Sequence, residues 1–98
     1  MTPPELSVII VTYRSRKDIE SCLRSVRAAV EGISAEVVVI DNASGDGTVE
    51  IAGAQPDVRV VALPTNVGFA AGINAGLRAT TGRYVWWVNP DGRLIGGS

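Results

Sequence analysis

The chain has 98 residues, of which 46% are hydrophobic, with nine basic and ten acidic side chains. This length allows one domain with a single core, and the net charge of -1 gives no overall indication of a nucleic-acid or anionic-membrane partner. The sequence shows neither an apolar run long enough to cross a bilayer nor a signal-peptide pattern, so we expect a cytoplasmic domain without an integral membrane segment.

The first part of the chain predicts a buried strand followed by an amphipathic helix. The strand is expected over residues 6–13, because residues 7–11 are almost all β-branched and apolar, as in a strand covered on both faces. Ser15 and Asp18 form a capping-box pattern that predicts the helix start, and Gly32 predicts its end. Apolar residues recur at helical spacing at Ile19, Cys22, Leu23, Val26, Ala29 and Val30.

Cysteine and histidine usage restricts the chemistry of the chain. Cys22 is the single cysteine and histidine is absent, which excludes an internal disulfide, a cysteine metal cluster and a Ser-His or Cys-His triad within these residues. Because Cys22 falls on the apolar face of the predicted helix, we expect a buried, inert thiol rather than a nucleophile. The chemistry must therefore rest on carboxylates and backbone amides.

The second predicted strand, residues 37–40, is β-branched throughout and reads as a central strand. It ends in Asp41, and residues 42–47 are typical of a turn. A short helix over residues 48–54 follows, with Asp46 or Thr48 as its cap.

The second half repeats the alternation of strands and helices. We expect a strand over 58–63, a helix over 68–80 and a strand over 84–88, with a loose tail at 96–98. Glycines 68, 72 and 76 lie on one ridge of this helix, where they would let another backbone or a ligand approach closely. The alternation predicts an α/β fold with three layers: a mostly parallel four-stranded sheet with helices on both faces.

Two aspartates, Asp41 and Asp91, follow predicted strands directly. If these strands are parallel and near neighbours, both carboxylates lie at one edge of the sheet, where α/β proteins bind ligands. There a carboxylate can accept a hydrogen bond from a nucleobase or ribose, or coordinate a divalent cation. It can equally cap the turn that follows it, and the spacing fits both roles.

Four segments occur in order across almost the whole chain: SVIIVTY (7–13), VIDNASGDGT (39–48), NVGFAAGINAG (66–76) and NPD (89–91). Together they resemble the family-two glycosyltransferases, close to the rhamnosyltransferase-like branch. The resemblance implies a GT-A, Rossmann-like fold that binds a nucleotide-diphospho-sugar and transfers the sugar, with inversion, to an acceptor hydroxyl.

The resemblance also implies a role for individual residues. Thr12 and Tyr13 would border the nucleobase, and Asp41 would hold the base or the ribose. At the DXD-like motif, Asp91 would bind a magnesium or manganese ion that bridges the diphosphate. The implied donor-binding residues are Thr12, Tyr13, Asp41, Asn42, Asn66, Gly68, Asn74 and Asn89.

Members of this family continue beyond the DXD-like turn into an acceptor-binding half that supplies a carboxylate as general base. Here no acidic residue follows Asp91, so we expect residues 1–98 to be the donor-binding half, truncated after this motif and incomplete for turnover. The strand over 84–88 would then expose an edge, which predicts self-association through it. The alternative is a non-catalytic nucleotide-sugar-binding or structural module that self-associates.

Overall fold

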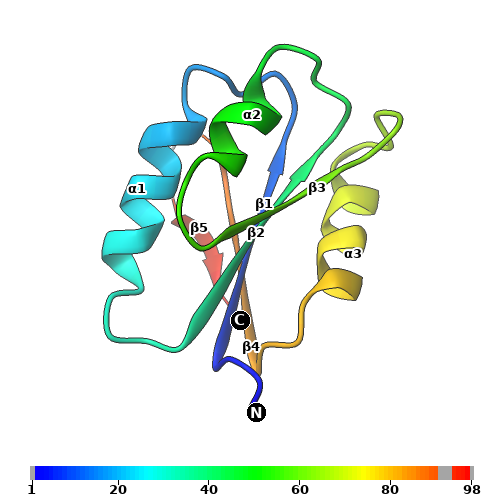
Figure 1. The fold of residues 1–98 in the computed structure, drawn as a ribbon. Coiled ribbons are helices and arrows are strands. Elements are labelled where there is room, and N and C mark those ends of the chain that lie inside the picture. The colour runs from blue at the N-terminus through cyan, green and yellow to red at the C-terminus, as the bar shows by residue number, and fades with distance from the viewer. Residues whose placement is uncertain (1, 91–93, 98) are drawn as a thin grey trace.

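The computed structural model describes residues 2–90 and 94–97. Strands and helices alternate along the chain as the sequence predicts (Figure 1). The elements are β1 (Leu6–Thr12), α1 (Ile19–Ala29), β2 (Ala35–Asp41), α2 (Thr48–Gly53), β3 (Val58–Ala62), α3 (Phe69–Ala79), β4 (Tyr84–Val88) and β5 (Leu94–Gly97).

The strands form one sheet in the order β3-β2-β1-β4-β5. The first four are parallel, so their carboxyl ends meet at one edge of the sheet, here called the carboxyl edge; the opposite edge is the amino edge. Helices α1 and α2 cover one face and α3 covers the other, as Figure 1 shows with β3 in front. The predicted three-layer α/β fold is confirmed, and β2 and β4 both lie next to β1.

The fifth strand, β5, is absent from the four-stranded sheet that the sequence predicts. β5 pairs antiparallel with β4, with Trp86 opposite Gly97 and Trp87 opposite Gly96. The expectation that residues 96 and 97 are loose was wrong, and so was the expectation of a free edge at β4, on which the predicted self-association depended. Glycines are poor strand formers, so β5 forms only because it pairs with β4. Its sequence therefore contains no pattern that predicts a strand.

The core lies on both faces of the two central strands. Under α1 and α2, apolar side chains of β1, β2 and β4 pack with Ile19, Leu23 and Val26. Cys22 is fully buried in this cluster, as predicted, and its thiol donates to the carbonyl oxygen of Asn89 at 3.6 Å. A second cluster, under α3, contains Ile9, Val11, Val38 and Ile40. Within the described residues, no helix has the length and apolarity needed to cross a membrane.

The glycines of α3 let the helix approach β1. A Cβ atom on Gly72 would lie 2.8 Å from Cγ1 of Val11, and one on Gly76 would lie 2.5 Å from Cγ2 of Ile9. The predicted close approach is confirmed at these two positions, where the helix backbone packs directly against side chains of β1. Gly68 instead precedes the helix, with a φ of 87° that favours glycine.

The helix starts differ from the predicted caps. The N-cap of α1 is Asp18, which makes no side-chain capping bond. The Ser15 carbonyl accepts the N–H groups of Asp18 and Ile19, and the Ser15 hydroxyl bonds the Tyr13 carbonyl instead of a helix N–H.

The N-cap of α2 is Gly47. The carboxylate of Asp46 accepts hydrogen bonds from the Thr48 hydroxyl at 2.5 Å and N–H at 3.1 Å, and these bonds lower the pKa of Asp46.

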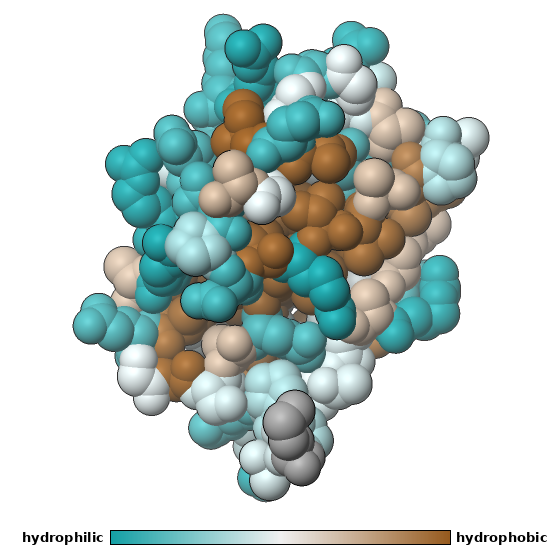
Figure 2. Space-filling model, viewed as in Figure 1, coloured by the Kyte–Doolittle hydropathy of each residue, from teal (hydrophilic) through white to brown (hydrophobic). Residues whose placement is uncertain are grey.

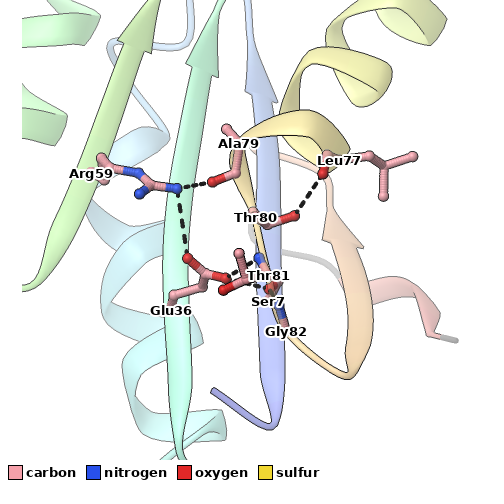
Figure 3. A network of polar contacts seen from close by, with 8 residues as sticks. All are labelled: Ser7, Glu36, Arg59, Leu77, Ala79, Thr80, Thr81 and Gly82. Carbon is pink, nitrogen blue, oxygen red and sulfur yellow. Dashed lines mark hydrogen bonds and ion pairs between the residues drawn. The ribbon is translucent and has the colours of Figure 1, made fainter. Parts of the chain in front are cut away.

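A polar network ties the connection between α3 and β4 to the sheet near the amino edge (Figure 3). The Ser7 hydroxyl donates to Glu36 at 2.6 Å and accepts from the Gly82 N–H at 2.8 Å, and Arg59 forms an ion pair with Glu36. Burial by itself raises the pKa of Glu36, but the bonds from Ser7 and from the Thr81 and Gly82 N–H groups, with the Arg59 charge, outweigh it and lower that pKa.

Candidate functional site

Two adjoining hollows open at the carboxyl edge, and both are lined by Val11, Tyr13 and Phe69. The first, here called the Asn42 hollow, has a volume of about 240 Å³ and is completed by Thr12, Asn42, Asn66 and Gly68. The second, the Asn89 hollow, has a volume of about 360 Å³ and is completed by Arg14, Ser15, Asp18, Asn89 and Pro90. Together they combine apolar and polar groups from the turns after β1, β2, β3 and β4, a mixture typical of ligand sites.

Exposed aromatic rings stand at the junction of the hollows. Tyr13 is 48% exposed, and the guanidinium carbon of Arg14 lies 5.3 Å from the centre of its ring, within range of a cation–π interaction. Phe69 is 54% exposed and packs edge to face on Trp87, with ring centres 5.7 Å apart. Both rings therefore offer apolar surface to a planar ligand. Arg14 holds the orientation of the Tyr13 ring, and Trp87 holds that of Phe69.

Asp41 lines neither hollow but is hydrogen-bonded to Thr12, which lines one of them. It is only 1% exposed, and its carboxylate accepts hydrogen bonds from the Thr12 hydroxyl at 2.7 Å, the Ser44 N–H at 2.9 Å and the Ser44 hydroxyl at 2.6 Å. Of the two roles that the spacing allowed, the structure shows turn capping. A carboxylate has about four lone-pair sites, so this one has little capacity left for a ligand; direct contact of Asp41 with a base or ribose stays a prediction.

Asn42 connects three segments of the carboxyl edge. Its N–H donates to the Thr12 carbonyl at 2.8 Å, its side-chain oxygen accepts from the Val67 N–H at 3.0 Å, and its side-chain nitrogen donates to the Gly68 carbonyl at 3.1 Å. Asn66 in turn accepts from the Gly68 N–H at 2.8 Å, as in an Asx turn. These bonds give the loop before α3 its shape, and with it one wall of the Asn42 hollow.

The remaining predicted residues are placed differently. Asn89 lines the Asn89 hollow at the end of β4, whereas Asn74 is exposed on α3 and belongs to neither hollow. Asp91, the predicted metal ligand, lies outside the described residues. Where the chain is described, no group of three or more acidic or cysteine side chains could hold a metal ion.

Three residues of the site, Arg14, Ser44 and Phe69, are not among those predicted from the sequence. Phe69 directly follows Gly68 in the NVGF segment, and an apolar aromatic at a helix start beside a turn was an available signal. Ser44 was read as a turn former only. Arg14 sits between Tyr13 and the predicted helix, and no local pattern indicates that its backbone has a φ of +52°.

Larger hollows occur elsewhere, but they lack this arrangement. One of about 460 Å³ lies where β2 and β3 begin and has a mainly aliphatic lining, including Val37 and Val58. Figure 2 shows apolar side chains gathered on the side of the molecule where β3 lies in front. Volume alone therefore does not select the site; the convergence of strand-end polar groups does.

The comparisons with known proteins agree on one family. Residues 7–95 match the family model described as Glycosyl transferase family 2. The succinoglycan biosynthesis protein ExoO of Rhizobium meliloti (strain 1021) is 36% identical over 90 residues, which are 90% of this chain and 26% of the relative. Dolichol-phosphate mannosyltransferase of Pyrococcus furiosus is 30% identical over 81 residues, 80% of this chain and 23% of the relative.

Solved structures show the same fold. Mannosyltransferase PcManGT from Pyrobaculum calidifontis, in complex with GDP-Man and Mn²⁺, superimposes with a TM-score of 0.78 at 31% identity, covering 93% of this chain and 28% of that chain. Glucosyl-3-phosphoglycerate synthase from Mycobacterium tuberculosis, in complex with Mn²⁺, UDP and glucosyl-3-phosphoglycerate, gives 0.77 at 28% identity, covering 89% and 33%.

This chain therefore spans a third or less of the length of each of these relatives. Its parallel four-stranded sheet with flanking helices matches the fold of GT-A glycosyltransferases. With a family model that matches residues 7–95, the conclusion is direct: the chain belongs to glycosyl transferase family 2.

Proposed function

We propose that this chain forms the donor-binding part of a glycosyltransferase, which binds a nucleotide-diphospho-sugar and transfers the sugar, with inversion, to an acceptor hydroxyl. One observation carries the proposal: two adjoining hollows at the carboxyl edge combine exposed aromatic rings with strand-end polar groups. The fold supports it, since two structures that share it were solved with GDP-Man or UDP and Mn²⁺.

The nucleobase is assigned to the Asn42 hollow. There, Tyr13 is half-exposed, and Thr12, Asn66 and Gly68 also line the hollow. A flat base could stack on the ring while the loop groups bond its edges, since stacking on an aromatic face depends little on base identity. Asp41 and Asn42 would act mainly by holding the surrounding turns, because their polar atoms are already bonded to the chain.

The diphosphate is assigned to the Asn89 hollow. Asn89 supplies a carboxamide beside this hollow and Asp91 follows two residues later, and such oxygen ligands suit Mg²⁺ or Mn²⁺. A bound cation would neutralise the charge that develops on the leaving diphosphate. Arg14 also lines this hollow and would bring a positive charge near the diphosphate, opposite in sign to that of Asp18 in the same lining.

The residues that line the two hollows are not assigned to the activation of the acceptor hydroxyl. Transfer requires a base that takes the proton of the acceptor hydroxyl, and no acidic residue follows Asp91 in this sequence. We therefore assign binding of the donor, and not the role of general base, to the residues described above. The resemblance to the rhamnosyltransferase-like branch adds nucleotide-linked rhamnose to the donors worth testing.

Calorimetry tests the proposal. UDP and GDP should bind the chain in MnCl₂, and binding should weaken at least tenfold in EDTA if the cation joins diphosphate to protein. Nucleoside monophosphates serve as the control, because they lack the second phosphate. A folded chain that binds none of the nucleoside diphosphates would refute the proposal.

A further inference from the structure

We propose that Ser44 is a positioning residue for nucleotide binding, which acts by holding Tyr13 and Arg14 in the shape that the two hollows require. This inference rests on the function proposed above and assigns a role to a side chain outside the predicted donor-binding set. Its basis is a relay of hydrogen bonds that runs from the end of β2 to the turn after β1.

The relay passes through one hydroxyl group. The Ser44 hydroxyl donates to Oδ1 of Asp41 at 2.6 Å and accepts from the Arg14 N–H at 2.7 Å. The same carboxylate accepts from the Thr12 hydroxyl at 2.7 Å, so the end of β1 is held on both sides of Tyr13. Thr12, Asp41 and Ser44 are all buried, and bonds of this kind to a carboxylate are strong when water is excluded.

The backbone conformations show what the relay holds in place. Arg14 has a φ of 52° and Ala43 a φ of 58°, in the left-handed region that side chains with a Cβ rarely adopt. One residue lies in the turn after β1 and the other immediately precedes Ser44. Strained residues persist only where their surroundings over-determine them, and they concentrate at functional sites. Here the over-determining contacts are the two bonds of the Ser44 hydroxyl and the bond of its N–H.

Losing the hydroxyl should therefore release the turn after β1. Without its partner, the N–H of Arg14 can turn away and the residue can relax toward negative φ. Tyr13, directly before Arg14, would then lose the orientation that presents its ring to both hollows. Nucleotide affinity should fall although Ser44 itself lines neither hollow.

The chain contains a matched control for this experiment. Ser7 is fully buried, and its hydroxyl also donates to a carboxylate, Glu36, at 2.6 Å and accepts from a backbone N–H, that of Gly82, at 2.8 Å. It lies near the amino edge, in the network that Figure 3 shows, and lines neither hollow. Ser7→Ala and Ser44→Ala thus each remove one hydroxyl bond to a carboxylate and one from a backbone N–H, at opposite ends of the sheet.

The test combines calorimetry with UDP and GDP in MnCl₂ and amide hydrogen exchange followed by NMR. Ser44→Ala should weaken nucleotide binding about tenfold, as expected when a preorganised contact must be ordered on binding, while Ser7→Ala stays within about twofold of the unmodified chain. Exchange of the Arg14 amide should accelerate in Ser44→Ala only. Ser44→Thr, which keeps a hydroxyl, should restore most of the affinity.

A second variant addresses the strained backbone. Asparagine adopts positive φ more readily than arginine, so in an Arg14→Asn background the Ser44→Ala substitution should cost at most about threefold in affinity. Equal affinity of Ser44→Ala and the unmodified chain, or equal losses in Ser44→Ala and Ser7→Ala, would overturn the inference alone. Failure of the unmodified, folded chain to bind either nucleotide would overturn the proposed function and this inference together.

Discussion

Replacing Tyr13 by alanine provides the most direct measurement of how the site binds a nucleotide. The ring is 48% exposed and lines both hollows, so about half of its surface remains available to a ligand. A tyrosine buries roughly 200 Å² when fully covered, which leaves about 100 Å² for a stacked base. At about 25 cal/mol per Å², this area corresponds to about 2.5 kcal/mol, close to the 1–3 kcal/mol that stacking of one base contributes.

Tyr84 supplies the control. It is 50% exposed and lies under the guanidinium of Arg83, 5.5 Å from the ring centre, which reproduces the surroundings of Tyr13 at the start of β4 instead of at the carboxyl edge. Tyr84→Ala therefore removes an equivalent ring and cation–π contact without touching the hollows.

Calorimetric titration of UDP and GDP in MnCl₂ should show a loss of about 1.5–2.5 kcal/mol for Tyr13→Ala, or roughly 10- to 70-fold in Kd. Tyr84→Ala should bind as the unmodified chain does. If Tyr13→Ala binds both nucleotides with unchanged affinity, or if the two substitutions weaken binding equally, then the assignment of the nucleobase to the Asn42 hollow is wrong.

Three further predictions concern stability and can be checked by urea denaturation. Gly76→Ala should destabilise the fold by about 1–3 kcal/mol because its Cβ would meet Ile9, whereas Gly53→Ala, with open space around it, should stabilise it by up to about 1 kcal/mol; effects of equal sign would refute this. Gly82→Ala should cost at least about 2 kcal/mol, since its Cβ would collide with the β1 backbone, and a neutral result would contradict that packing. Glu36 has a lowered pKa in the folded chain, so its contribution is complete above its ordinary value of 4.5 and is lost as the pH falls through the folded value. Glu36→Gln weakens the charge-assisted hydrogen bonds from Ser7 and Thr81, so it should cost about 1 kcal/mol at pH 7. This difference should shrink below pH 4.5, and a difference independent of pH would rule out the linkage.

The sequence predicted those parts of the fold that have a local pattern. The β-branched runs of β1 and β2, the apolar face of α1 and the close approach of Gly72 and Gly76 all follow from residue type and spacing. β5 could not be predicted in this way, because its Gly-Gly pair becomes a strand only through the neighbouring β4. The prediction of the α1 cap was wrong for a related reason. The Ser15 hydroxyl bonds the Tyr13 carbonyl instead, and the helical pattern does not reveal this competing partner.

For the site, the sequence indicated which turns matter but not how their side chains are used. It identified the turn after β2 through Asp41 and Asn42, yet both side chains are largely occupied by bonds to the chain itself. The groups that face the hollows include Arg14 and Phe69, whose placement depends on backbone conformation and on packing between distant segments. Chemical type is visible in a sequence, whereas orientation is decided by contacts between strands.

The position of β1 between β2 and β4 sets a length scale for whatever binds above the sheet. Neighbouring strands lie about 4.8 Å apart, so the turns that follow β2 and β4 are separated by roughly 10 Å across the end of β1. In the donor-binding role proposed above, the base would lie at the turn after β2, and the diphosphate would extend past the end of β1 toward the turn after β4. The strand order thus sets the separation of the two turns that such a ligand would have to reach.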